Sequence, residues 1–257
     1  MKFLEYSDLK IIPGAGSFYF KGNSIGLLII HGGGGGTCAD LKLLAQDLNK
    51  ARGYTIKLPL LPGYGTSPED LRKTPISSWR FALENEVKEL KEECDKIIIG
   101  GHSMGGLLSL ILAANFKFDA LFTINTPIEI GRFGLWLVPF VNIFMKYHSV
   151  NSIQLKKETK GKWVGYDKIP INIAMKVKKL IRETKKSLPR ITSPAILFQG
   201  CLDSEIKKES LNYIFNNINT QCKKKIWLEN NGHSILDCPD HKQIVLELSE
   251  FIDKICT

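Results

Sequence analysis

Short runs of apolar residues alternate with helical segments along most of this chain, and this alternation constrains the fold more than any other feature. Strands are expected at residues 26–30, 54–60, 96–100, 120–125, 194–200 and 224–228. Segments between them carry apolar residues three and four positions apart, as amphipathic helices do. Nearly continuous apolar strands separated by helices favour parallel pairing with both sheet faces covered. The sequence therefore predicts an open α/β domain.

Composition agrees with an ordinary globular protein. The chain has 257 residues, of which 44% are hydrophobic and 24% charged, so it can bury a large core without disulfides or metals. Its six cysteines form no CxxC pair, and we expect reduced thiols. Glu5 and Asp8 interrupt the start of the chain where a signal peptide needs an apolar stretch. The longest nearly apolar run, residues 133–145, is too short for a membrane span, and we expect a cytoplasmic protein.

The strand and helix alternation stops at Thr126 and resumes at Pro194. We therefore expect residues 1–126 and 191–257 to form the core and residues 127–190 to form an inserted cap. The formal net charge of +9 lies in that insertion, which holds 14 Lys and Arg against four Asp and Glu. A basic cap would suit weak association with an anionic lipid surface, although a Lys-rich helix is more commonly only a solvated face.

The segment Gly101-His102-Ser103-Met104-Gly105 joins a predicted strand to a predicted helix. A serine on such a sharp turn needs small residues on both sides, and the turn lifts its hydroxyl clear of the sheet. The helix amino terminus also favours negative charge developing at an attacked carbonyl. This context predicts that Ser103 is a nucleophile.

A serine nucleophile needs a base, and the base needs an acid that orients it. Asp203 follows the strand at 194–200, and His233 follows the strand at 224–228. A lone Asp or His in a loop is usually a turn former or a surface residue. Their joint placement after strands, in the chain order serine, acid, histidine, predicts a catalytic triad.

Other polar residues near these positions leave alternatives. Asp237 is the rival acid, although it is expected to begin the next helix. His31 and His102 flank the site and are expected to pack and form hydrogen bonds around the turn.

Five glycines at residues 32–36 follow the first predicted strand. Flanked by His31 and Thr37, they cannot satisfy GxGxxG, and no GK[ST] follows, so nucleotide binding is disfavoured. Glycine does let the backbone approach a substrate closely. We expect the N–H groups of Gly33 and Met104 to form an oxyanion hole.

Several of these motifs together resemble the small bacterial carboxylesterases and monoacylglycerol lipases of the α/β-hydrolase superfamily. They are the HGGGGG run, residues 61–71 (LPGYGTSPEDL), Trp79, the turn at Ser103, the loop of Asp203 and the Gly232-His233 loop. The resemblance extends from about residue 12 to the end and is weakest in the predicted cap. It implies a sheet of about seven strands with a small helical cap at its carboxyl edge.

The resemblance also implies hydrolysis of carboxylic esters without metal or cofactor, by the same triad and oxyanion residues. Two positions depart from the family pattern. Gly33 stands where a bulky apolar residue is common, and Tyr64 stands where a histidine is common. Both bear on substrate size.

The predicted cap carries large apolar residues at helical spacing, including Trp136, Phe140 and Phe144. They either pack the cap on the core or line an acyl-chain pocket. We expect a serine esterase acting on short to medium acyl esters, including monoacylglycerols. The alternatives are an acyl thioesterase on the same triad and a ligand-binding protein without activity. The absence of HExxH, cysteine pairs and aromatics interleaved with a basic helix argues against metal and nucleic-acid sites.

Overall fold

One seven-stranded sheet forms the centre of the molecule. The computed structural model describes residues 10–129, 145–236 and 238–256. The strands are β1 (Phe18–Phe20), β2 (Ile25–Ile30), β3 (Thr55–Leu58), β4 (Lys96–His102), β5 (Ala120–Ile124), β8 (Ala195–Gly200) and β9 (Lys223–Leu228). Their spatial order is β1-β3-β2-β4-β5-β8-β9, and all pairs are parallel except β1 with β3. The predicted α/β class, with a mostly parallel sheet of about seven strands, is confirmed.

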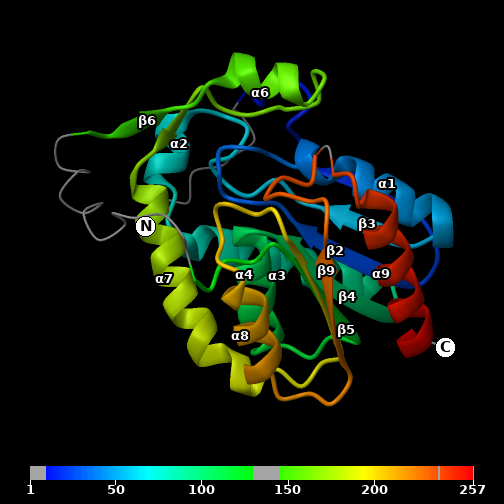
Figure 1. Ribbon diagram of the computed structural model, residues 1–257. Helices are drawn as coiled ribbons and strands as arrows, with labels where there is room; N and C mark the ends of the chain where they lie inside the picture. Colours follow the sequence, from blue (N-terminus) through cyan, green and yellow to red (C-terminus); the bar gives the residue numbers. More distant parts are fainter. Residues whose placement is uncertain (1–9, 130–144, 237, 257) are drawn as a thin grey trace.

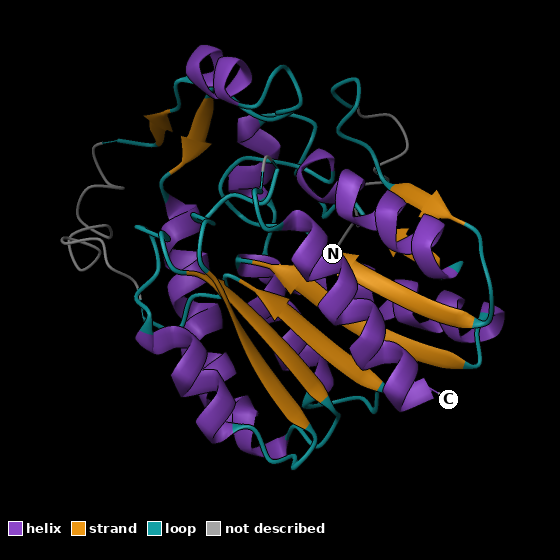
Figure 2. Cartoon of the chain, turned by 45° about the vertical axis from the view of Figure 1, so that its right-hand side comes forward, coloured by secondary structure: helices purple, strands orange, loops and turns teal. Residues whose placement is uncertain are grey.

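Helices cover both faces of the sheet (Figures 1 and 2). On one face lie α1 (Ala39–Arg52) and α9 (His241–Cys256), and on the other lie α3 (Ile76–Glu93), α4 (Met104–Ala113), α7 (Asn172–Ser187) and α8 (Glu209–Asn217). Alternate residues along a strand point to opposite faces of the sheet. In β2, Leu27 and Ile29 are buried with α1 and α9, whereas Leu28 and Ile30 are buried with α3 and α4. This two-sided burial explains the unbroken apolar strands.

The parallel arrangement also sets the position of the polar loops. The carboxyl ends of β4, β5, β8 and β9 meet at one edge of the sheet. Ligand sites in open α/β sheets lie outside that edge. Ser103, Asn125, Asp203 and His233 all follow one of these strands.

Some elements differ from the sequence expectation. Strand β3 ends at Leu58 rather than at residue 60, because Pro59 has no N–H for the ladder. The short strand β1 and the helix α2 (Pro68–Lys73) were not predicted. Ser67 caps the amino terminus of α2, where its side chain accepts a hydrogen bond from the Asp70 N–H, and Pro68 is the first residue of the helix.

The described part of residues 127–190 contains several elements beyond the sheet edge. Strands β6 (Tyr147–Ser149) and β7 (Lys168–Pro170) pair with each other, and α6 (Ser152–Glu158) lies between them in the chain. Figure 1 shows α6 above the sheet and α7 running down beside it. Leu180 and Thr184 of α7 are fully buried, and α7 packs on α4. The division into a core and a cap at residues 127 and 190 stays a prediction.

Two further sequence expectations bear on the whole chain. All six cysteines are free thiols. No helix in the described ranges is long and apolar enough to cross a membrane.

Candidate active site

Ser103 occupies a strained turn between β4 and α4. Its φ of 53° and ψ of −119° lie outside the regions that non-glycine residues prefer. The two flanking glycines allow the turn. A Cβ on Gly101 would lie 2.6 Å from the Ile30 carbonyl oxygen, and one on Gly105 would lie 2.1 Å from that same atom. Both distances are far below a normal contact, so the GxSxG spacing is a steric requirement of this fold.

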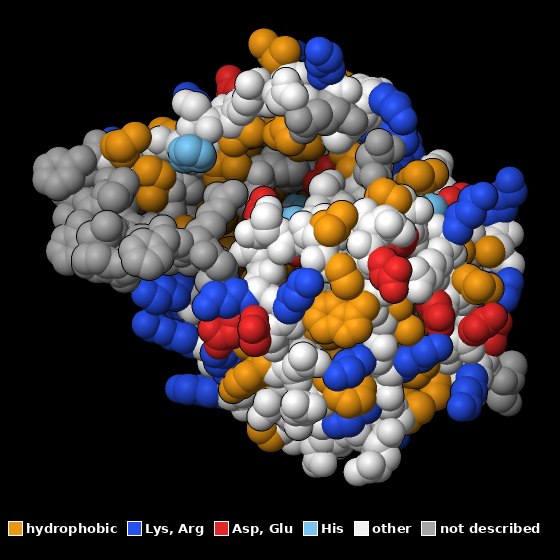
Figure 3. Space-filling model, viewed as in Figure 1, with side chains coloured by type: hydrophobic (Ala, Val, Ile, Leu, Met, Phe, Trp, Pro, Cys, Tyr) orange, Lys and Arg blue, Asp and Glu red, His pale blue; other side chains and the backbone are white. Residues whose placement is uncertain are grey.

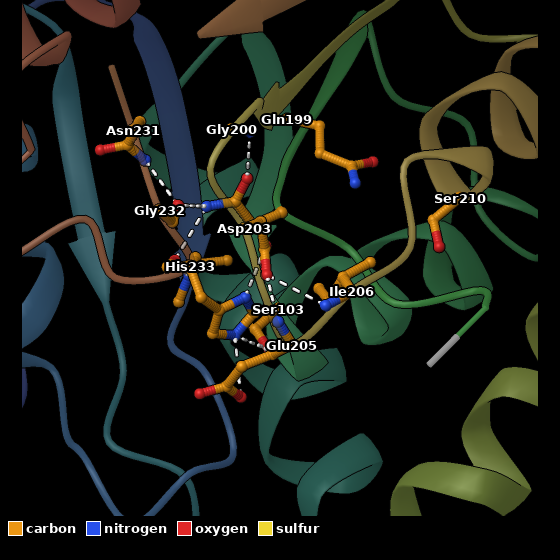
Figure 4. Close-up of polar contacts among 12 residues, drawn as sticks. Ser103, Gln199, Gly200, Asp203, Glu205, Ile206, Ser210, Asn231, Gly232 and His233 are labelled. Atoms are coloured by element: carbon orange, nitrogen blue, oxygen red, sulfur yellow. Dashed lines mark hydrogen bonds and ion pairs between the residues drawn. The ribbon is translucent and has the colours of Figure 1, made fainter. Parts of the chain in front are cut away.

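His233 joins Ser103 to Asp203 by two hydrogen bonds (Figure 4). Its Nδ1 lies 2.8 Å from Asp203 Oδ2, and its Nε2 lies 3.1 Å from Ser103 Oγ. Since a carboxylate only accepts, Nδ1 carries the proton and Nε2 faces the serine hydroxyl. The structure therefore brings together the three residues that were expected to form a triad.

Asp203 is held in its ionised form by its surroundings. Its side chain is fully buried, and its Oδ1 accepts hydrogen bonds from the N–H groups of Glu205 (2.9 Å) and Ile206 (3.0 Å). Burial raises the pKa of Asp203, but the hydrogen bonds from His233 and from these two N–H groups outweigh burial and leave the pKa below its ordinary value. A charged Asp203 can fix the tautomer of His233 and stabilise its protonated form.

Asn125 holds the histidine loop, and sequence reasoning missed it. Its Nδ2 donates to the carbonyl oxygens of Gly232 (2.9 Å) and His233 (2.8 Å), while its Oδ1 accepts from the Gly200 N–H (2.8 Å). Asn125 also has a positive φ of 48°, which asparagine tolerates better than most residues. A signal was present, because Asn125 follows a buried strand at the same sheet edge as Ser103 and Asp203.

His31 and His102 pack around the turn as neutral side chains. His102 donates from Nε2 to the His233 carbonyl oxygen at 2.8 Å. His31 Nδ1 donates to the Gly32 carbonyl oxygen, and its Nε2 accepts from the Leu61 N–H. Burial lowers the pKa of His31 to about 4 and that of His102 to about 3. Both rings serve the loops around the site as fixed hydrogen-bonding groups.

The glycine run lies against the amino terminus of α4. A Cβ on Gly33 would lie 2.8 Å from Met104 Sδ and 3.1 Å from Met104 Cβ, so the Gly33 backbone lies close to Met104. Met104 is the first residue of α4, where N–H groups have no acceptor within the helix. The two residues expected to form an oxyanion hole are therefore neighbours.

Tyr64, one of the departures from the family pattern, supports this loop. Its buried hydroxyl donates to the Gly33 carbonyl oxygen at 3.2 Å. Residues 164–166 contact the same loop: the Tyr166 N–H donates to the Gly35 carbonyl oxygen at 3.1 Å, and the Val164 carbonyl oxygen accepts from the Thr37 hydroxyl at 2.8 Å. The glycine loop is thus held by Tyr64 on one side and by residues 164–166 on the other.

Four residues singled out in the sequence lie outside the described residues. They are Trp136, Phe140 and Phe144, the expected pocket residues, and the rival acid Asp237. In the described ranges, no three His, Cys, Asp or Glu side chains gather closely enough to hold a metal ion. The expectation that no cofactor is needed stays a prediction.

Comparison with known proteins matches the chain to a family model and to curated relatives. A family model described as alpha/beta hydrolase fold matches residues 27–159. The "Thermostable monoacylglycerol lipase" of Bacillus sp. (strain H-257) is 29% identical, over 95% of this chain and 96% of that protein. The "Carboxylesterase" of Bacillus subtilis (strain 168) is 28% identical, over 93% of this chain and 96% of that protein.

Solved structures agree at the level of the fold. A chain from a study of the metagenome-derived lipolytic enzymes LipS and LipT superposes with a TM-score of 0.85 at 26% identity, covering 95% of this chain and all of that one. A monoacylglycerol lipase of Paleococcus ferrophilus gives a TM-score of 0.75 at 19% identity, covering 91% of this chain and 98% of that one.

Proposed function

Because the chain belongs to the α/β-hydrolase family, we propose that it is a serine hydrolase that forms an acyl-enzyme on Ser103. It is a carboxylic ester hydrolase of the carboxylesterase and monoacylglycerol lipase type, as its relatives in Bacillus indicate. The observation that carries the proposal is the chain of hydrogen bonds from Asp203 through His233 to Ser103, on a strained turn that presents the serine hydroxyl.

The first half-reaction follows from the two hydrogen bonds of His233. Its Nε2 takes the proton of Ser103 Oγ while Oγ bonds to the ester carbonyl carbon. Asp203 stabilises the imidazolium that forms. The tetrahedral intermediate then collapses, the bond to the alcohol oxygen breaks, and His233 gives its proton to that oxygen. The acyl group remains on Ser103.

The oxyanion of the intermediate is stabilised by the N–H groups of Gly33 and Met104. The close approach of Gly33 to Met104 and the hydrogen bond from Tyr64 to the Gly33 carbonyl support this role. Water, deprotonated by His233, then attacks the acyl-enzyme and releases the acid. The substrates we propose are short to medium acyl esters, including monoacylglycerols.

A test uses p-nitrophenyl octanoate and the Ser103→Ala variant. We expect the variant to lose at least about 10³-fold in kcat/KM, because the nucleophile is removed while the fold stays intact. Circular dichroism checks the fold. Full activity of a folded Ser103→Ala protein would show that the nucleophile lies elsewhere.

The alternative acyl thioesterase is separated from an esterase by comparing kcat/KM for octanoyl-CoA with that for n-propyl octanoate. The proposal expects the simple ester to be the better substrate. A wild-type protein that hydrolyses neither ester nor thioester would instead favour a ligand-binding role.

A further inference from the structure

Glu205 places a second carboxylate beside the catalytic base. Its Oε2 lies 4.0 Å from His233 Nε2, the same nitrogen that lies 3.1 Å from Ser103 Oγ. Figure 4 shows the Glu205 side chain extending along the His233 ring next to Ser103. With 48% of its side chain exposed, the carboxylate is accessible from solvent. It therefore borders the place where substrate atoms meet the base.

The backbone of Glu205 is fixed by the triad itself. Its N–H donates to Asp203 Oδ1 at 2.9 Å, in the turn that also includes the Ile206 N–H. The turn that shapes the catalytic acid thus sets where the Glu205 side chain begins. Its place beside His233 is a consequence of the site's construction.

The position of Glu205 assigns it to one side of the substrate. In the proposed mechanism, His233 Nε2 gives its proton to the departing alcohol oxygen. A group that contacts the surroundings of Nε2 therefore faces the departing alcohol, whereas the acyl carbon is bonded to Ser103. The Glu205 carboxylate therefore contacts the alcohol part of the ester rather than the acyl part.

A carboxylate in this place can discriminate between departing alcohols in two ways. It only accepts hydrogen bonds, so it can bind a free hydroxyl of the departing alcohol, such as the one on C2 of a 1-monoacylglycerol. It also repels phosphate or carboxylate groups on a departing group. Resting on the proposed function, we propose that Glu205 is a specificity-determining residue that favours esters of polyols such as glycerol and disfavours anionic departing groups.

The test compares two neutral esters of one acid, 1-monooctanoylglycerol and n-propyl octanoate, which differ in the free hydroxyls of the alcohol. The ratio of their kcat/KM values is measured for the wild type, Glu205→Ala and Glu205→Gln. We expect the ratio to fall about tenfold in Glu205→Ala, because the acceptor is lost. The fall should be smaller in Glu205→Gln, which keeps an amide oxygen.

Charge is tested with 3-octanoyloxypropanoate, whose departing alcohol carries a carboxylate close to the ester oxygen. Relative to n-propyl octanoate, its kcat/KM should rise several-fold in Glu205→Gln, which removes the charge at nearly constant shape. Glu209→Gln is the matched control, because it removes a charge from an exposed side chain of α8 near the same loop. It should leave both ratios as in the wild type.

Failure of this proposal is distinguishable from failure of the proposed function. If the wild type hydrolyses both octanoate esters and neither ratio moves in the Glu205 variants, Glu205 has no role in specificity although the enzyme is an esterase. If Glu209→Gln shifts the ratios as much as Glu205→Gln, the effect is one of net charge and the assignment is wrong. A wild type inactive on every ester overturns both proposals.

Discussion

At the scale of single residues, Asn125 joins two loops that the mechanism needs in register. Its side chain bonds to Gly200, which precedes the loop of Asp203, and to Gly232 and His233. It contacts no reacting atom in this arrangement. In the proposed mechanism Asn125 is therefore a positioning residue, which acts through the backbone of His233.

We expect Asn125→Ala to lower kcat for p-nitrophenyl octanoate by about 10- to 100-fold, since small misplacements of a catalytic group are costly. Losing the three hydrogen bonds of this buried side chain should also lower the free energy of unfolding by about 2 kcal/mol. Steady-state kinetics and urea unfolding measure the two effects. A folded variant with unchanged kcat and lowered stability would leave Asn125 with a structural role only.

Buried histidines make the stability of the fold depend on pH. Folding lowers the pKa of His31 to about 4 and that of His102 to about 3, whereas in the unfolded chain each has a pKa near ~6.5. Between these values the unfolded state binds more protons, so stability is lost as pH falls below about 6.5. Each histidine should remove about 2 kcal/mol between pH ~7 and pH ~5.

Urea unfolding at these two pH values tests this account with His102→Gln, whose amide nitrogen can take the place of Nε2 without titrating. The variant should lose about 2 kcal/mol less than the wild type over that interval. An equal loss in both proteins would mean that His102 does not drive the acid sensitivity.

At the scale of elements, the turn from β4 into α4 depends on glycine. Alanine is the better helix former by about 1 kcal/mol, but a Cβ on Gly105 would collide with the Ile30 carbonyl oxygen. We expect Gly105→Ala to lower the free energy of unfolding by at least about 2 kcal/mol. Gly34→Ala is the control, because a Cβ there meets nothing within 4 Å. If both variants unfold at the same urea concentration, the close approach does not limit the turn.

Most elements of the core could be predicted from the sequence because the central strands are buried on both faces and helices such as α1 and α3 have one apolar face. Strand β1 has only three residues and lies at the sheet edge, so it leaves no such pattern. Helix α2 was hidden because its proline and capping serine also mark turns. Helix α7 has an apolar face that packs on α4, but its many lysines favoured the interpretation of this segment as a solvent-exposed helix.

The candidate site was predictable to the same extent. Ser103, Asp203 and His233 were predicted because each follows a strand and because they occur along the chain in the order serine, acid, histidine. Asn125 also follows a strand at this edge, but its hydrogen bonds to other loops, like the place of Glu205 beside His233, depend on distances that no spacing in the sequence encodes.

At the scale of the whole molecule, the positive charge gathers over α7, as Figure 3 shows. A cavity of about 810 Å³ lies between α3 and α7, lined by Arg80, Lys178, Lys179 and Arg182 and by apolar residues that include Met175. Glu183 pairs with Arg80. Lys178, Lys179 and Arg182 support the proposal that this face of α7 associates weakly with anionic lipid surfaces.

Sedimentation with phosphatidylglycerol vesicles at low ionic strength measures this association. We expect Lys178→Glu/Lys179→Glu to weaken binding at least about tenfold, and added salt to weaken binding of the wild type. Lys21→Glu/Lys88→Glu makes the same change in net charge at exposed sites away from that cavity. Equal losses in both double variants, or binding insensitive to salt, would leave α7 as a solvated face.

The most direct test of the account is covalent labelling of the intact protein with a fluorophosphonate, read by mass spectrometry. An activated serine is predicted to take up one label per chain, with the adduct mapped to Ser103 and labelling strongly slowed in His233→Ala. A folded wild type that remains unlabelled, or that carries its label on another residue, would contradict the assignment of Ser103 as the nucleophile.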